Sequence, residues 1–456
     1  MSSIVIAGDT SGSVTLQAPA VAGSTILTLP STTGTIALTS GITPGGSTTQ
    51  VQYNNAGAFG GITGATTNGT ALTLVAPVLG TPASGVLTSC TGLNYDGFKN
   101  RFINGDMRID QRNANASINL GTSTFSADRW VGYNNDSTGV IASQVVTDAP
   151  TNSGFVNSVR LTVSTAIPSY STAVACFFRQ TIEGNNIADF MWGTASAKSF
   201  TLSFWVKSSV TGTFGGTANS GDSNRTYGFT YVISAANTWE QKTINIAGDT
   251  SGTWYTDNRG GLILNFGLGV GTNRTVSTTG AWVNQFLGWQ PTGTIQWASN
   301  VGATWNITGV QLEKGSTATS FDVRSIGTEL ALCQRYCTTI NDATTSGYIQ
   351  GYGGGCRGTT YIGVTIPLPV AMRSTPSLSN VGGTVRLTVA GSKVDSASSS
   401  MTIGGVTPTI GYSANSGNLA ITYIGGPVTG LTGIANDVCV TFFTNGDGKL
   451  FALSEL

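Results

Sequence analysis

Residues 99–130 read KNRFINGDMRIDQRNANASINLGTSTFSADRW, and the composition of the chain changes at this stretch. Residues 1–98 contain no lysine or arginine and only two carboxylates, Asp9 and Asp96. The quoted stretch carries eight charged side chains: Lys99, Arg101, Asp106, Arg108, Asp110, Arg112, Asp128 and Arg129. A change of this kind marks a domain boundary, so we expect the first globular domain to begin here.

Downstream of this stretch, apolar and polar residues alternate in many short runs. Such runs are VRLTVS (159–164), FTLSFWVK (200–207), KTINIAG (242–248), LILNFGLGVG (262–271) and ATWNITGVQL (303–312). Because successive side chains of a strand point to opposite faces, this period of two predicts strands with one buried face. Together the runs predict an all-β fold with a jelly-roll-like β-sandwich domain over residues 99–325.

The first 98 residues alternate short β-like runs, such as SIVIAG and SVTLQAP, with turn residues. Each run is too short to form a core, and such strands gain stability by pairing with neighbouring chains. We interpret residues 1–40 as an attachment segment and residues 41–98 as a glycine- and threonine-rich shaft. The alternatives are a flexible leader and a disordered linker, and the aliphatic content disfavours the linker.

The pattern changes again near residue 326. In IGTELALCQRYCTTI, the residues Ile326, Leu330, Cys333 and Cys337 share the three-four spacing of one helical face. This spacing predicts one short helix that packs at a junction. Strand-like runs then return, so residues 326–456 are predicted to form a C-terminal β-domain.

The overall composition excludes several classes of protein. The net charge is zero and only 9% of the residues are charged, whereas a nucleic-acid binder shows a basic stripe. No basic segment followed by an apolar core begins the chain, and no run of about eighteen apolar residues could span a membrane. Uncharged, glycine-rich strands have exposed edges, so we expect an obligate oligomer that buries them.

Cysteine and histidine usage bears on metals and catalysis. The chain has no histidine, which removes Ser-His-Asp and Cys-His nucleophile systems and makes zinc improbable at Cys333 and Cys337. We expect buried thiols, no cofactor and no metal. A glycosidase needs only two carboxylates, but the one tight acidic pair, Asp106 and Asp110, sits beside Arg108 and Arg112 and is better explained as part of a solvated or ion-paired strand. The prediction is therefore a protein that is not an enzyme.

Binding is the remaining function, and sugars are held by aromatic faces together with planar polar groups. The tryptophans between Trp130 and Trp305 could form such a platform, but a sandwich core explains them better. Two loop-like stretches offer the required mixture, against the alternative that each is an ordinary turn. The candidate glycan-binding residues are Trp254, Tyr255, Asp257, Asn258 and Arg259 in the first stretch, and Tyr348, Gln350, Tyr352, Arg357 and Tyr361 in the second.

The motif R-F-I-N-G-D-M at residues 101–107, followed by Q-R at 111–112 and A-D-R-W at 127–130, resembles the opening of a β-sandwich domain of bacteriophage tail fibres. GVQLEKGSTATSFDVRSIGTELALCQRYC (309–337) is similar to the end of that domain, and the leader is similar to stalk segments of phage fibres. The resemblance implies a homotrimer in the virion, docked by its N-terminus to a tail, baseplate or neck protein.

The resemblance also implies that the distal β-domains adsorb to a host surface polysaccharide. The alternative is a structural appendage, such as a neck, collar or head fibre, without a receptor site. Sandwiches of the resembled family sometimes hold a structural calcium between their first and last strands, where Asp106 and Asp322 stand in this sequence. Two carboxylates without a full set of oxygen ligands make a weak calcium site.

Overall fold

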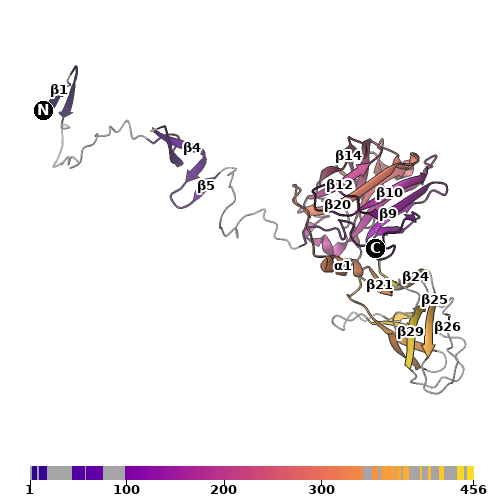
Figure 1. Ribbon diagram of the computed structural model, residues 1–456. Coiled ribbons are helices and arrows are strands. Elements are labelled where there is room, and N and C mark those ends of the chain that lie inside the picture. Colours follow the sequence, from indigo (N-terminus) through magenta and orange to yellow (C-terminus); the bar gives the residue numbers. More distant parts are fainter. Residues whose placement is uncertain are drawn as a thin grey trace. The chain divides into compact units, whose positions relative to one another are not determined.

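The computed structural model forms two units, Met1–Leu93 and Asn94–Leu456, whose elements are drawn in Figure 1. No helix in the described part of the chain is long and apolar enough to cross a membrane. The described residues are 3–7, 10–17, 44–56, 58–74, 98–341, 352–357, 361–374, 376–381, 384–389, 401–402, 409–411, 421–425, 439–445 and 449–456.

The N-terminal unit contains short antiparallel strands. β1 (Ser3–Ala7) pairs with β2 (Ser13–Gln17), and β3 (Gln50–Asn55), β4 (Ala58–Thr67) and β5 (Leu72–Leu74) form a three-stranded sheet. Several large apolar side chains of these strands are exposed, as at Ile4 (66%) and Leu72 (59%), whereas Ala65 of β4 is buried. Exposed apolar strands of this kind are suited to pairing with another chain.

A two-layer sandwich forms the main body of the second unit. One layer is a six-stranded antiparallel sheet in the order β15 (Glu240–Ile246), β12 (Phe200–Ser208), β20 (Thr304–Lys314), β10 (Ser158–Thr165), β9 (Val140–Val146), β6 (Ile118–Asn119). The other is a seven-stranded antiparallel sheet in the order β18 (Trp282–Asn284), β14 (Arg225–Ile233), β13 (Gly212–Ser220), β16 (Gly260–Val270), β11 (Ala175–Glu183), β8 (Trp130–Asn134), β7 (Thr124–Ala127). The predicted all-β sandwich is confirmed.

Short elements connect these layers. β17 (Thr275–Val276) and β19 (Gln290–Pro291) form a parallel pair beside the seven-stranded sheet. Single 3₁₀ turns lie at η2 (Gly184–Asn186), η3 (Ala188–Phe190), η4 (Thr272–Arg274) and η5 (Trp297–Ser299).

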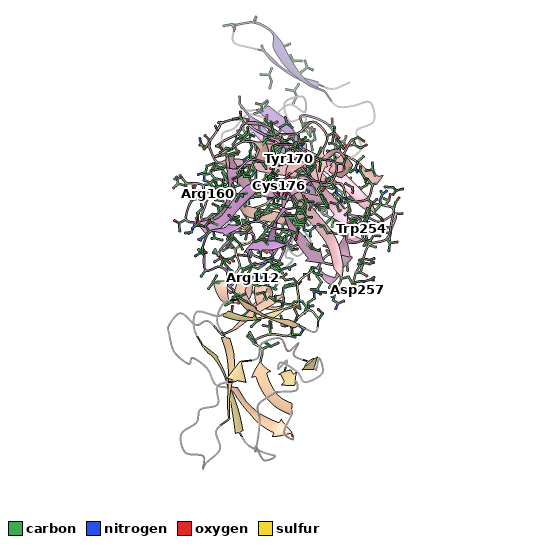
Figure 2. All side chains as sticks on the ribbon, turned by 90° about the vertical axis from the view of Figure 1, so that its right-hand side faces the viewer. Arg112, Arg160, Tyr170, Cys176, Trp254 and Asp257 are labelled. Atoms are coloured by element: carbon green, nitrogen blue, oxygen red, sulfur yellow. The ribbon has the colours of Figure 1, made fainter. Side chains whose placement is uncertain are left out.

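The core lies between the two sheets and is rich in aromatic rings. Phe204 of β12 meets Phe266 of β16 across the layers, with ring centroids 5.0 Å apart. Trp130, Trp297 and Trp305 are fully buried, so the core interpretation holds for these indoles. Side chains fill the sandwich throughout (Figure 2).

The stretch that opens this domain folds around Asn104, which is fully buried and has a φ of +57°. Asparagine tolerates this left-handed conformation better than most residues. Its side-chain amide donates to the carbonyl oxygens of Ile109 (2.8 Å) and Asp128 (3.0 Å). The Trp130 indole donates to the Asn104 carbonyl at 2.9 Å, so residues from both ends of the stretch are fixed to one point in the core.

The predicted helix is α1 (Ile326–Gln334), and it packs against this opening stretch. Cys333 and Tyr336 form a buried cluster with Ile103 and Ile109. The predicted apolar face is wrong at its two ends, because Ile326 is 54% exposed and Cys337 belongs to β21 (Cys337–Asn341). The helix ends at Gln334, whose carbonyl accepts a hydrogen bond from the Thr338 hydroxyl.

Buried ion pairs join the chain after α1 to the sandwich. Glu183, at the end of β11, accepts hydrogen bonds from Arg335 Nη2 (2.7 Å) and the Tyr336 hydroxyl (2.6 Å). Burial alone would raise the pKa of the Glu183 carboxyl, but these hydrogen bonds outweigh burial and hold the pKa below its ordinary value.

The C-terminal residues are held at the same place. Glu455 pairs with Arg112 at 2.7 Å and also with Arg129. The Arg129 guanidinium lies 3.6 Å from the centroid of the Tyr336 ring. Cys176, Cys333 and Cys337 are buried free thiols, as predicted.

Strands also dominate the C-terminal part. β21 and β24 (Ser377–Val381) flank β30 (Lys449–Leu453). The remaining strands form a seven-stranded sheet in the order β26 (Met401–Thr402), β25 (Thr384–Val389), β29 (Cys439–Asn445), β22 (Tyr352–Arg357), β23 (Tyr361–Pro367), β28 (Ile421–Gly425), β27 (Thr409–Gly411).

The Glu183 ion pair predicts a pH-dependent stability. Its pKa is depressed in the folded protein, so its contribution is complete above the ordinary value of 4.5 and is lost as the pH falls through the lower folded value. At pH 7, Glu183→Gln should lower the free energy of unfolding by about 2 kcal/mol. Denaturant titrations should show the difference from wild type shrinking below pH 4.5. A difference that is constant down to about pH 3 would contradict this assignment.

Candidate functional site

The outer face of the six-stranded sheet carries polar side chains and half-buried aromatic rings. On β12 the buried residues Leu202 and Phe204 alternate with Ser203 and Trp205, which point away from the core. The strand register places Trp205 between Gln241 of β15 and Thr308 of β20. An indole on this face is therefore flanked by an amide and a hydroxyl.

A β-bulge shapes the centre of this face. Ser203 aligns with Gln311 and Trp205 with Thr308, so β20 has one more residue than β12 between these pairs. The bulge contains Gly309, whose φ is +60°. A Cβ atom there would lie 2.6 Å from Phe155 Cζ and 3.2 Å from Trp205 Cδ1. Glycine thus allows both rings to rest directly on the strand.

Two hollows share a pair of phenylalanine rings in their walls. Phe155 and Phe321 meet edge to face, with ring centroids 4.9 Å apart and an interplanar angle of 82°. One hollow, of about 220 Å³, is lined by these two rings and by Ser153, Ser203, Trp205, Gln241, Gly309, Thr319 and Ser320. We call this first cavity the aromatic hollow.

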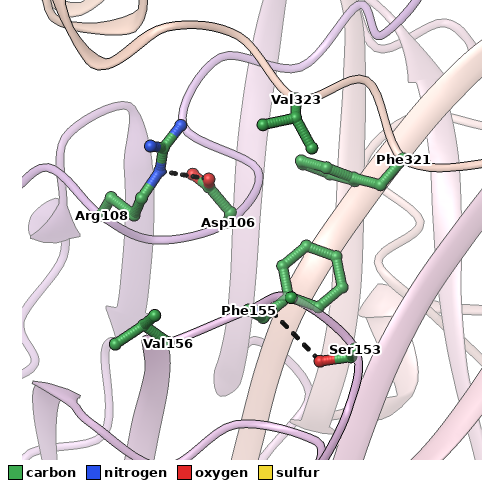
Figure 3. A pocket seen from close by; sticks show the side chains of 8 residues that line it. Asp106, Arg108, Ser153, Phe155, Val156, Phe321 and Val323 are labelled. Atoms are coloured by element: carbon green, nitrogen blue, oxygen red, sulfur yellow. Dashed lines mark hydrogen bonds and ion pairs between the residues drawn. The ribbon is translucent and has the colours of Figure 1, made fainter.

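The second hollow, of about 180 Å³, is also lined by the two phenylalanine rings (Figure 3). Its walls include the exposed side chains of Val156 and Val323 and the ion pair between Asp106 and Arg108. Burial raises the pKa of the Asp106 carboxyl in spite of this ion pair.

A charged cluster lies on the same face of the sheet. Asp148 accepts hydrogen bonds from Lys207 Nζ (2.6 Å) and Arg160 Nη2 (2.5 Å), and from the Trp239 indole at 3.3 Å. Partial burial would raise the pKa of Asp148, but these donors outweigh it and keep the pKa below its ordinary value. The cluster therefore holds Lys207 and Trp239 in fixed positions beside Trp205.

The first predicted binding stretch does not form a platform. Trp254 is a core residue, packed between Trp192 and Trp282 with ring-centroid distances of 4.6 Å and 5.3 Å. The prediction that it lies on a binding surface is therefore wrong. A tryptophan after a glycine-rich turn could lie on either side of the strand layer, and here the neighbouring indoles draw it inward. In Figure 2, Asp257 lies well away from Arg160 of the polar face.

The other members of that stretch are mainly engaged with one another. Arg259 pairs with Asp257 at 2.8 Å and stacks 3.7 Å from the centroid of the half-buried Tyr255 ring. The Asn258 amide donates to the Arg373 carbonyl, and Arg373 donates back to the Asn258 carbonyl. Asn258 therefore serves the junction with the C-terminal part.

Part of the second predicted stretch is strand and not loop. Tyr352 and Arg357 begin and end β22, and Tyr361, which opposes Arg357, begins β23. Tyr348 and Gln350 lie outside the described residues. The binding role of these five residues stays a prediction.

The structure also gives the partners of the predicted acidic pair and of the residues implied in calcium binding. Asp110 accepts from Asn113 and Asn115 in a turn, and Asp322 pairs with Arg324 at 3.4 Å. Within the described ranges, no group of three or more cysteine, aspartate or glutamate side chains could hold a metal ion. Asp106 and Asp322 do not fit a calcium site, because each is already engaged by an arginine.

Sequence reasoning missed the polar face of the sheet. The run FTLSFWVK (200–207) gave the necessary signal, because its alternation places Trp205 and Lys207 on the side opposite to Phe204 and Val206. The partners Phe155 and Phe321 lie in segments without periodicity, so only the fold brings them together.

No protein-family model and no curated protein sequence matches this chain. A similar solved structure is the enzymatically active domain of tailspike protein 4 of bacteriophage CBA120, at 15% identity and a TM-score of 0.27. The match covers 48% of this chain and 22% of the tailspike chain, so this chain spans less than a quarter of that protein.

Two smaller proteins are matched over almost their whole length. A putative sugar-binding protein from Bacteroides thetaiotaomicron has 13% identity and a TM-score of 0.29, and the match covers 47% of this chain and 99% of that one. The family 11 carbohydrate-binding module from Clostridium thermocellum, solved with a mixed-linked tetrasaccharide, has 11% identity, a TM-score of 0.23 and coverages of 45% and 99%.

The bulge glycine can be tested through a matched pair of substitutions. Gly309→Ala should destabilise the protein by about 2 kcal/mol more than Gly302→Ala, because both positions have a left-handed φ but only a Cβ at 309 meets another residue. Thermal or denaturant unfolding of the two variants measures this difference. Equal losses would show that the Phe155 and Trp205 rings do not depend on close contact with the strand.

Proposed function

We propose that this protein is a glycan-binding protein whose binding site is the aromatic hollow on the outer face of the six-stranded sheet. The observation that carries the proposal is the placement of Trp205, Phe155 and Phe321 around a hollow whose other walls are hydroxyl and amide side chains. Sugar rings offer apolar C–H faces to aromatic rings and hydroxyl groups to polar side chains, so both kinds of wall are matched.

The size of the hollow suits a surface polymer better than an enclosed small molecule. Its volume of about 220 Å³ is below the usual range of small-molecule pockets, roughly 300–1,000 Å³. Each sugar unit would make few contacts, so a useful binding affinity would require several copies of the hollow in one oligomer. The proposed activity is binding without catalysis.

The wider role that we propose is that of a bacteriophage tail fibre subunit, a homotrimer that adsorbs to host surface polysaccharide. Two features support it: the resemblance of residues 101–130 and 309–337 to fibre domains, and the nearly chargeless leader. The exposed apolar side chains of β1 and β5 give the N-terminal unit surfaces that other chains could cover. A neck, collar or head fibre is the second candidate, since it would share the leader and the oligomer.

Substitution of Trp205 tests the binding site. On the full-length protein, Trp205→Ala should weaken binding to the preferred oligosaccharide about thirtyfold, the loss expected at a central aromatic contact. The oligosaccharide is selected with wild type on a glycan array, and affinities are measured by calorimetry. Tyr255→Ala, in the stretch predicted from the sequence, is the matched control and should bind as wild type does.

The reverse pattern, with loss in Tyr255→Ala and none in Trp205→Ala, would move the site to residues 254–259. Melting temperatures of both variants show whether any loss reflects unfolding. No binding of wild type to any glycan would contradict the proposed activity itself.

Deletion of residues 1–40 tests the assembly. The truncated protein should sediment as a trimer of its shortened chain, as the full chain should at three times 46.8 kDa, and should no longer be incorporated into particles. Labelled full-length protein should lie at the tail. Label at the collar or capsid would favour the second candidate, and a monomer would overturn the trimer.

A further inference from the structure

A row of polar side chains crosses the outer face of the six-stranded sheet beside the aromatic hollow. Arg160 of β10 lies opposite Gln144 of β9 on one side and Asn306 of β20 on the other. Lys207 of β12 also lies opposite Asn306. Because Lys207 and Trp205 are two residues apart on one strand, they share its outer side, and their Cα atoms are about 7 Å apart. The row therefore places two cations where the next sugar of a chain bound at Trp205 would lie.

Asp148 holds both cations but cannot satisfy all of their donors. Its oxygens accept two hydrogen bonds from Lys207 Nζ, at 2.7 and 2.6 Å, one from Arg160 Nη2 at 2.5 Å and one from the Trp239 indole at 3.3 Å. A carboxylate offers about four acceptor sites, so that of Asp148 is filled. Within the described part of the chain, Nη2 is the one guanidinium nitrogen of Arg160 with a hydrogen-bond partner.

The side chains at this place carry one more positive charge than negative, since Arg160 and Lys207 share the single carboxylate of Asp148. The six strands themselves contain two acidic residues, Glu240 and Glu313. Glu240 already pairs with a lysine of its own strand at 2.6 Å, and Glu313 is buried and hydrogen-bonded. The excess positive charge is accessible, because the Arg160 side chain is 38% exposed.

The remaining N–H groups of Arg160 suit an anionic group carried by a sugar. A guanidinium presents paired donors that match a carboxylate or a phosphate. Asp148 already fixes Arg160, so little side-chain freedom is lost when a ligand binds. A free inorganic anion would gain this exposed contact alone and would bind weakly. A sugar chain held in the aromatic hollow would instead bring its anionic group to Arg160 at a high effective concentration.

We propose that the glycan bound by the aromatic hollow is acidic, and that Arg160 pairs with a carboxylate or phosphate group on the sugar next to the one at Trp205. Lys207 adds its charge to the same place. This inference rests on the proposed function of the hollow and names the class of glycan that the hollow prefers. Trp205 determines whether a sugar binds, and Arg160 determines the preference for an acidic one.

The experiment measures binding of the full-length protein to a glycan array in low salt. The array carries oligosaccharides of uronates, sialates and sugar phosphates, each beside its own neutral form, which is the methyl ester or the dephosphorylated sugar. The oligosaccharide that wild type binds most tightly should be acidic, and its neutral form should bind about fivefold more weakly. The preference should shrink at about 1 M salt, where exposed charges are screened. Whether that ligand is a carboxylate or a phosphate identifies the anionic group.

Two variants shift the local charge in opposite directions. Arg160→Gln should weaken binding of the acidic ligand about fivefold and leave its neutral form unchanged, with a melting temperature close to that of wild type, because Asp148 keeps its bonds to Lys207. Asp148→Asn should strengthen binding of the acidic ligand. The matched control is Lys198→Gln, which removes an exposed positive charge just before β12, at the opposite end of that strand from Lys207. It should bind as wild type does.

Three results would overturn the inference and leave the hollow as a sugar site: a neutral oligosaccharide as the tightest ligand, an unchanged preference in Arg160→Gln, or an equal loss for the acidic and neutral forms in that variant. A loss of the same size in Lys198→Gln would also overturn it, because it would indicate general charge attraction. Failure of wild type to bind any glycan would contradict the proposed function itself. Loss of both forms in Trp205→Ala, with the preference lost only in Arg160→Gln, is the expected pattern.

Discussion

The packing of the two sheets against each other is the constraint on which the surface of the sandwich depends. Phe204 and Phe266 meet across the core, and once they face inward the period of a strand turns their neighbours outward. Trp205 therefore lies on the outer side of the six-stranded sheet. The candidate binding surface there also depends on Phe155 and Phe321, rings that loops bring to the sheet.

A second constraint is the junction built around the stretch that opens the domain. Asn104 gathers both ends of that stretch, and α1 closes over it through Cys333 and Tyr336. The ion pairs of Glu183 and Glu455 are largely removed from water, so their hydrogen bonds must be complete to be favourable. The C-terminal residues are thus part of the sandwich's own structure, although they follow it by more than a hundred positions in sequence.

Much of the fold could be predicted from local pattern, because period-two alternation determines strands and their buried faces. The helix at Ile326 was also predictable, but its end was not: Cys337 continues the helical spacing and still belongs to β21, because the chain turns after Gln334. The binding site was harder to predict from the sequence. Composition favoured Trp254, which neighbouring indoles draw into the core, whereas Phe155 and Phe321 become a site only through a bulge at Gly309 that local sequence does not reveal.

The central claim is that sugar binds against the six-stranded sheet. The most direct measurement is a crystal structure of the full sandwich with a bound neutral oligosaccharide selected for affinity. The account predicts density for a sugar ring stacked on Trp205 or Phe155, with hydroxyl groups bonded to side chains such as Ser203 and Gln241. A sugar bound at residues 254–259 or in the C-terminal part, with this hollow free, would contradict it.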